Sequence, residues 1–136
     1  MLQAGLKGGI AYALMTFAAG FVLGSIRIFA VVPHLGETAA VALEMPIMLA
    51  ISWLLAGQNV RWFRVPPRAI DRALMGAVAF MVLMVGETAL AVIAFGRGLS
   101  EEFATFRSPA GALGLTAQIM FATFPLLWLA RARRRP

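Results

Sequence analysis

Four long apolar stretches, each separated from the next by a few turn-forming or charged residues, constrain this sequence more than any other feature. The first is a charge-free run from Gly8 to Ile26, which lies between Lys7 and Arg27. A helix needs roughly 20 apolar residues to cross the hydrocarbon core of a bilayer. The pattern therefore predicts four transmembrane helices, over residues 8–32, 37–56, 73–95 and 109–130.

The breaks between these stretches carry the residues that end helices. We expect turns at residues 33–36, 57–59, 66–67 and 96–98, all rich in glycine, proline or asparagine. Residues 98–108 are expected to hold a short interfacial helix capped by Ser100.

Composition supports a membrane protein. The 136-residue chain is 61% hydrophobic and 13% charged, whereas soluble domains are about half apolar and a quarter charged. We therefore expect a single integral membrane domain over residues 1–136, folded as an all-α antiparallel bundle of four transmembrane helices.

The basic residues predict how this bundle is oriented. Nine of them flank one side of the predicted spans, and two, Arg97 and Arg107, flank the other. Short cytoplasmic loops are enriched in lysine and arginine, so we expect both termini in the cytoplasm. The nine are Lys7, Arg61, Arg64, Arg68, Arg72, Arg131, Arg133, Arg134 and Arg135. The last four form a basic tail that suits anionic lipid; nucleic acid is not expected as a partner.

Four polar residues lie inside the predicted spans, one in each helix: Arg27, Glu44, Glu87 and Gln118. At about 1.5 Å of rise per residue, the last three lie roughly 12–14 Å below the outer interface. Ionisable groups at that depth almost always face the bundle interior and pair. We expect the four to form one buried polar network.

Within this network, we expect Arg27 to pair with Glu44, because a short loop joins the first two helices. Glu87 would then have no cation of its own, and it must be protonated, bind a cation or reach water. His34 and Glu37 are expected at the outer mouth above the network. We interpret the network as a buried clamp that fixes the helix register; the alternatives are a proton, ion or solute site and a catalytic site.

Glycine and proline residues predict further features of the bundle. Gly20 and Gly24 form a small-xxx-small pair on the face of Arg27, so we expect close helix packing there. Pro46 and Pro125 are expected to kink their helices and to free the carbonyl groups of Ala42 and Phe121.

The residue types restrict the chemistry. The chain has no cysteine and one histidine, so we expect no metal site and no cofactor. No nucleophile–base pair accompanies the buried carboxylates, and we assign no catalytic residue and expect no enzyme.

The run GFVLGSIRIFAVVPHLGETAAVALEMPIMLAISW, together with the later helix pattern, resembles a group of small, uncharacterised bacterial four-helix membrane proteins. The resemblance spans most of the chain, implies an inner-membrane location and implies no activity. Small multidrug transporters also have four helices, but their membrane glutamate lies in the first helix, where this chain has Arg27. We therefore do not extend the multidrug-transport function to this protein.

Three functions remain compatible with the sequence, of which an intramembrane enzyme, supported only by the paired glutamates, is the third. The first is an accessory or structural subunit of a larger membrane assembly, favoured by the small size of the chain. The second is a small homo-oligomeric transporter or ion pathway, linked to protons or cations through the buried glutamates.

Overall fold

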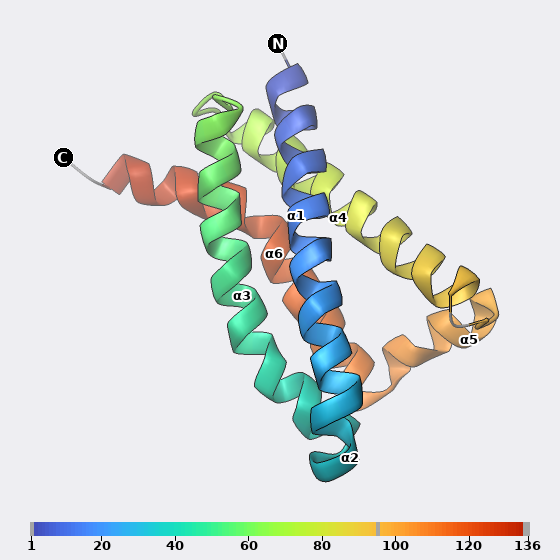
Figure 1. Ribbon diagram of the computed structural model, residues 1–136. Helices are drawn as coiled ribbons and strands as arrows, with labels where there is room; N and C mark the ends of the chain where they lie inside the picture. Colours follow the sequence, from blue (N-terminus) through green and yellow to red (C-terminus); the bar gives the residue numbers. More distant parts are fainter. Residues whose placement is uncertain (1, 95, 135–136) are drawn as a thin grey trace.

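The structure is a computed structural model that describes residues 2–94 and 96–134 (Figure 1). These residues form helices and loops, with no strand among them. The long helices are α1 (Gln3–Ile26), α3 (Glu37–Trp62), α4 (Ala69–Ile93) and α6 (Pro109–Arg134). Short segments join them: a π-helical turn (Arg27–Val31), α2 (Val32–Leu35), α5 (Leu99–Ala104) and a 3-10 turn (Thr105–Arg107).

The predicted all-helical architecture is confirmed, and four helical stretches in the described part are long and apolar enough to cross a membrane. The start of α3 at Glu37 and the start of α6 at Pro109 lie where the sequence predicts them. The other helix limits differ by several residues. The first helical stretch runs from Gln3 to Leu35.

The predicted end of the second helix at residues 57–59 is wrong. Helix α3 continues to Trp62 because tertiary contacts stabilise this turn. The Asn59 amide donates a hydrogen bond to the Leu55 carbonyl at 2.8 Å, and the ring of Trp128 packs over Gly57. A side chain on Gly57 would collide with that ring, so this glycine serves packing and does not end the helix.

The four long helices are arranged so that α1 packs against α3 and α4, and α6 packs against the same two helices. Both termini and the α3–α4 loop lie toward one end of the bundle, which we call the terminal end (Figure 1). Helices α2 and α5 lie toward the opposite end, which we call the α5 end. Figure 1 also shows α1 and α4 diverging toward the α5 end.

The tightly packed core lies nearer the terminal end. Tyr12, Met75, Phe121 and Phe124 are all buried there. Pro125 has no N–H to donate to the carbonyl group of Phe121, and the Tyr12 hydroxyl donates to that oxygen at 2.8 Å. The predicted free carbonyl thus receives its hydrogen bond from another helix, which fastens α1 to α6.

Close helix packing does not occur at the predicted glycines, and this prediction is wrong. A Cβ on Gly20 or Gly24 would meet only the flexible ends of Met48 and Arg27, at 3.6 and 3.8 Å. The close contacts lie nearer the terminal end, where a Cβ on Gly9 would come within 2.6 Å of the Met75 carbonyl oxygen. Helix α1 diverges from α4 toward the α5 end (Figure 1), and Gly20 and Gly24 border a cavity instead of a neighbouring backbone.

We predict that Gly76→Ala destabilises the bundle strongly. The added methyl group would overlap the carbonyl oxygen of Ala122 on α6, and overpacking of this kind costs about 1–3 kcal/mol. Gly114→Ala is the matched control, because a Cβ there meets no atom within 4 Å and alanine favours the helix. Thermal unfolding in detergent should show a lower Tm for Gly76→Ala alone. Equal Tm values for the two variants would contradict this packing.

Candidate functional site

The four polar residues predicted to form a network lie around one cavity in the half of the bundle nearer the α5 end. Arg27 comes from the π-helical turn, Glu44 from α3, Glu87 from α4 and Gln118 from α6. The cavity has a volume of about 520 Å³. Other polar residues in its wall are Thr16, Ser25, Glu37, Ser52, Arg97, Glu102 and Thr105.

Arg27 and Glu44 form the predicted ion pair. The Nη1 atom of Arg27 donates to Oε2 of Glu44 at 2.8 Å, and the two side chains are 28% and 15% exposed. Arg27 opens the π-helical turn, in which the Val32 N–H donates to the Arg27 carbonyl. Pro33 has no N–H for the regular α-helical bond, and a widened turn near a functional side chain is a recurring feature of π-bulges.

Glu87 and Gln118 form the second pair across the cavity wall. The Nε2 atom of Gln118 donates a short hydrogen bond to Oε2 of Glu87. A neutral amide cannot balance a negative charge. Among the residues that the structure describes, Glu87 makes no salt bridge, so it is a carboxyl group without a cation.

Two further polar atoms in this wall are buried without a hydrogen-bond partner in the described part of the chain. They are Oε1 of Gln118 and Oγ1 of Thr16, and the Thr16 residue is only 4% exposed. A buried polar atom that lacks a partner costs about 1–3 kcal/mol. The wall of the cavity therefore holds a carboxyl group without a cation and two buried oxygen atoms without a hydrogen-bond donor among the described residues.

The rim of the cavity nearest the α5 end carries charged residues from two sides. Glu37 lies in the wall, as expected for an outer-mouth residue. His34 is exposed in α2 and is not among the lining residues. On the opposite side, Arg97 donates to Glu102 of α5 at 3.4 Å. Helix α5 begins at Leu99 after Gly98, so Ser100 is not its N-cap.

The packed core borders the cavity. Thr16, Ser52 and Phe121 are among its lining residues, and Phe121 also belongs to the buried core cluster. Pro46 and Pro125 both lie inside helices that continue past them.

A second polar cluster, at the terminal end, was missed by sequence reasoning. Arg72 was assigned only as a topology determinant, but it is buried, at 6% exposure. Its guanidinium group donates to the carbonyl oxygens of Pro66, Val65 and Pro125 at 3.2, 3.4 and 3.3 Å. The cluster ties the α3–α4 loop to α6.

Asp71 belongs to the same cluster. Its side chain is fully buried, and its Oδ2 accepts a hydrogen bond from Nε of Arg68 at 2.5 Å. The spacing of Arg68, Asp71 and Arg72 around the start of α4 is the signal that could have revealed it, because a residue at the N-cap, such as Arg68, lies close to the side chain three residues later in the first turn.

We predict that Arg27 and Glu44 are energetically coupled. Because both side chains are partly exposed, Arg27→Ala should cost about 2 kcal/mol, between the values for surface and fully buried pairs. Glu44→Gln should also destabilise the fold. The double variant should lose at least about 1 kcal/mol less than the sum of the single losses.

Chemical unfolding in detergent of the native protein, the two single variants and the double variant measures this coupling. The Arg97–Glu102 pair is the internal control, because its arginine is 51% exposed, and exposed pairs contribute about 1 kcal/mol or less. Strictly additive losses for Arg27 and Glu44 would contradict the pairing.

Comparison of the chain with protein-family models, with curated proteins and with solved structures finds no match. The functional assignment therefore rests on the geometry and chemistry of the cavity.

Proposed function

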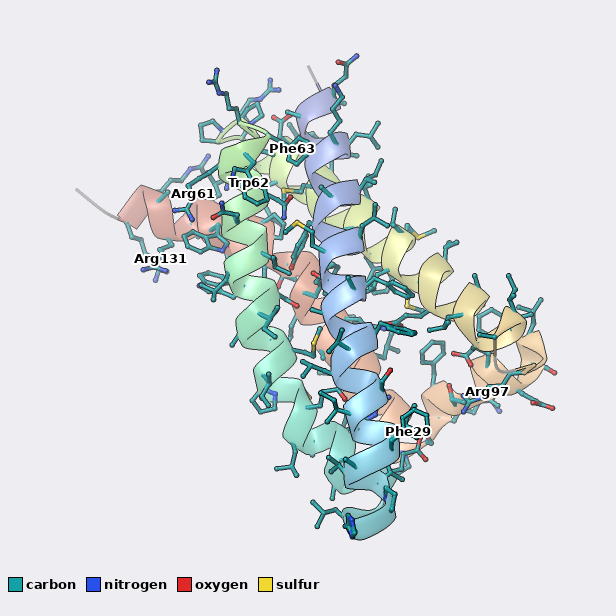
Figure 2. The ribbon with its side chains drawn as sticks, viewed as in Figure 1. Phe29, Arg61, Trp62, Phe63, Arg97 and Arg131 are labelled. Carbon is teal, nitrogen blue, oxygen red and sulfur yellow. The ribbon has the colours of Figure 1, made fainter. Side chains whose placement is uncertain are left out.

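We propose that the four long helices cross the inner membrane of a bacterium, with both termini and the α3–α4 loop in the cytoplasm. The exposed arginines support this orientation, because Arg61 and Arg131 lie toward the terminal end, whereas Arg97 lies toward the α5 end (Figure 2). Lysine and arginine accumulate on the cytoplasmic side. The exposed ring of Trp62 beside Arg61 suits the membrane interface.

The end of α6 suits an anionic lipid surface. Arg131, Arg133 and Arg134 are exposed there, and the Arg131 guanidinium lies 5.1 Å from the centroid of the Trp128 ring. Arg135, the fourth member of the predicted basic tail, lies outside the described residues. Clustered arginines next to a span attract anionic headgroups.

Single cysteines test the orientation, since the native chain has none. Pro67 and Ser100 are both exposed, in the α3–α4 loop and in α5. We predict that Ser100→Cys reacts with an impermeant maleimide in intact cells, and that Pro67→Cys reacts only after permeabilisation. External labelling of Pro67→Cys would overturn the proposed topology.

We further propose that the cavity binds a small organic cation and that the protein is a cation-linked transporter, assembled as a homo-oligomer. The observation that carries this proposal is Glu87, a carboxyl group that has no cation partner among the described residues and lines the same cavity as Gln118 and Thr16. An unbalanced carboxylate is costly in a membrane interior. A bound cation or a proton removes that cost, and the two would therefore compete for Glu87.

The charge and size of the cavity favour an organic cation over a bare ion. Four glutamates and two arginines line it, and both arginines are already paired. A volume of about 520 Å³ falls within the range of sites that hold small organic ligands, roughly 300–1,000 Å³. Phe121 lines the cavity and packs against Tyr12 in the core, so passage toward the terminal end would require a second conformation in which α1 separates from α6 at these two residues.

The competing proposal is an accessory subunit of a larger membrane assembly. Strongly exposed apolar side chains, such as Phe29 and Ile93 at 83% exposure each, suit either lipid or a partner subunit. Native mass spectrometry after gentle extraction separates the two proposals. A homo-oligomer supports transport, and a stable complex with other chains supports the subunit role.

Glu87→Gln tests the cation site. In the native protein, ethylammonium chloride well above its Kd should raise the Tm in detergent by roughly 2–5 °C, relative to sodium chloride at equal ionic strength. Glu87→Gln should fold but lose this shift, because glutamine retains the shape and removes the charge.

Glu101→Gln is the matched control, because Glu101 is exposed and lies outside the cavity wall. The Glu101→Gln variant should keep the rise in Tm that ethylammonium causes. An equal shift in the native protein and Glu87→Gln, or no shift in either, would reject the proposed site.

A further inference from the structure

An apolar groove lies on the surface between α1 and α4. Leu14 and Phe17 of α1 line one side, and four residues of α4 line the other: Met81, Val82, Val85 and Gly86. Its volume is about 420 Å³. Under the proposed topology the groove faces the hydrocarbon of the bilayer.

This groove and the polar cavity share a wall. Phe17 lines both, and Gly86 of the groove directly precedes Glu87 of the cavity. Gly86 contributes no side chain between them, and a Cβ there would lie 3.4 Å from the Phe17 ring. An apolar surface open to lipid thus adjoins a carboxyl group in a polar site.

We propose that the ligand is a single-chain amphiphile with a primary ammonium headgroup, which enters sideways from the bilayer between α1 and α4. This inference rests on the proposed cation site and adds to it the class of ligand. The headgroup lies against Glu87 and its N–H groups donate to that carboxyl group, in a part of the cavity that Gln118 and Thr16 also line. The alkyl tail lies along Phe17 in the groove.

Charge complementarity selects this occupant over an anionic or uncharged amphiphile. Within residues 2–94 and 96–134, Glu37 and Glu87 are the carboxyl groups of the cavity wall without a salt bridge, whereas Arg27 and Arg97 are each held by a glutamate. The chain as a whole carries a formal charge of +6. General electrostatic attraction would therefore favour an anionic amphiphile, and a preference for ammonium can arise only at a specific site.

Photolabelling of the full-length protein in phosphatidylcholine nanodiscs tests this inference. The probe is dodecylammonium with a diazirine group in its tail. We expect saturable labelling of Phe17, Met81 or Val85, located by mass spectrometry of the peptides. Unlabelled dodecylammonium should compete, dodecyl sulfate should not, and dodecyltrimethylammonium should compete at least about threefold more weakly because it has no N–H donors.

Two variants test separately where the headgroup and the alkyl tail of the ligand bind. Glu87→Gln should weaken labelling by at least about tenfold, and the charge-matched control Glu101→Gln should leave it unchanged. Gly86→Leu should abolish labelling in the groove because its side chain fills the space beside Phe17. The ethylammonium-induced Tm shift should survive in Gly86→Leu, which also shows that this variant is folded.

The outcomes separate this inference from the function on which it rests. If ethylammonium stabilises the protein but the groove is not labelled, the cation site stands and the amphiphile is rejected. If dodecyl sulfate competes as well as dodecylammonium, the groove holds alkyl chains without regard to charge, and the inference fails. If neither amine binds, both proposals fail.

Discussion

The ion pair between Arg27 and Glu44 is the interaction on which the rest of the site depends. A guanidinium group cannot lose its charge in a protein, so an arginine among apolar helices needs a carboxylate partner. Glu44 meets that need at 2.8 Å, and the widened turn after α1 begins at Arg27 itself. Because Arg27 is held by Glu44 and Arg97 by Glu102, the hydrogen-bond partner of Glu87 among the described side chains is the amide of Gln118. The carboxylate of Glu44 therefore stabilises the fold, and the carboxyl group of Glu87 is free to exchange a proton or a ligand.

The bundle divides into two halves with different packing. Nearer the terminal end, glycines allow backbone contact between helices, the Tyr12 hydroxyl bonds the Phe121 carbonyl, and Arg72 bonds three carbonyl groups of the loop and α6. Toward the α5 end, α1 and α4 diverge around the cavity (Figure 1). A rigid half can hold an open half in shape, which is how a site with unsatisfied acceptors persists in a small protein. The stability of one half offsets the cost of the other.

Much of this arrangement was predictable from local patterns. Apolar runs indicated the helices, and the cost of isolated charges indicated that Arg27 and Glu44 pair. The helix ends were less predictable, because Asn59 and Gly57 normally favour a turn but here make contacts with Leu55 and Trp128. Gly20 and Gly24 share a face with Gly9, yet only Gly9 touches a neighbouring backbone. The divergence of α1 from α4 decides which glycines make such a contact. The angle between two helices cannot be predicted from the spacing of residues along either helix.

The central claim is that Arg27 is held by Glu44, so that Glu87 remains available. Solid-state NMR of the protein in lipid bilayers measures this directly, through magnetisation transfer between the guanidinium nitrogens of Arg27 and the carboxyl carbons of the glutamates. The account predicts strong transfer from Arg27 to Glu44, together with transfer from the side-chain amide nitrogen of Gln118 to the carboxyl carbon of Glu87. Strong transfer from Arg27 to Glu87, with none to Glu44, would exchange the roles of the two carboxyl groups and contradict the account.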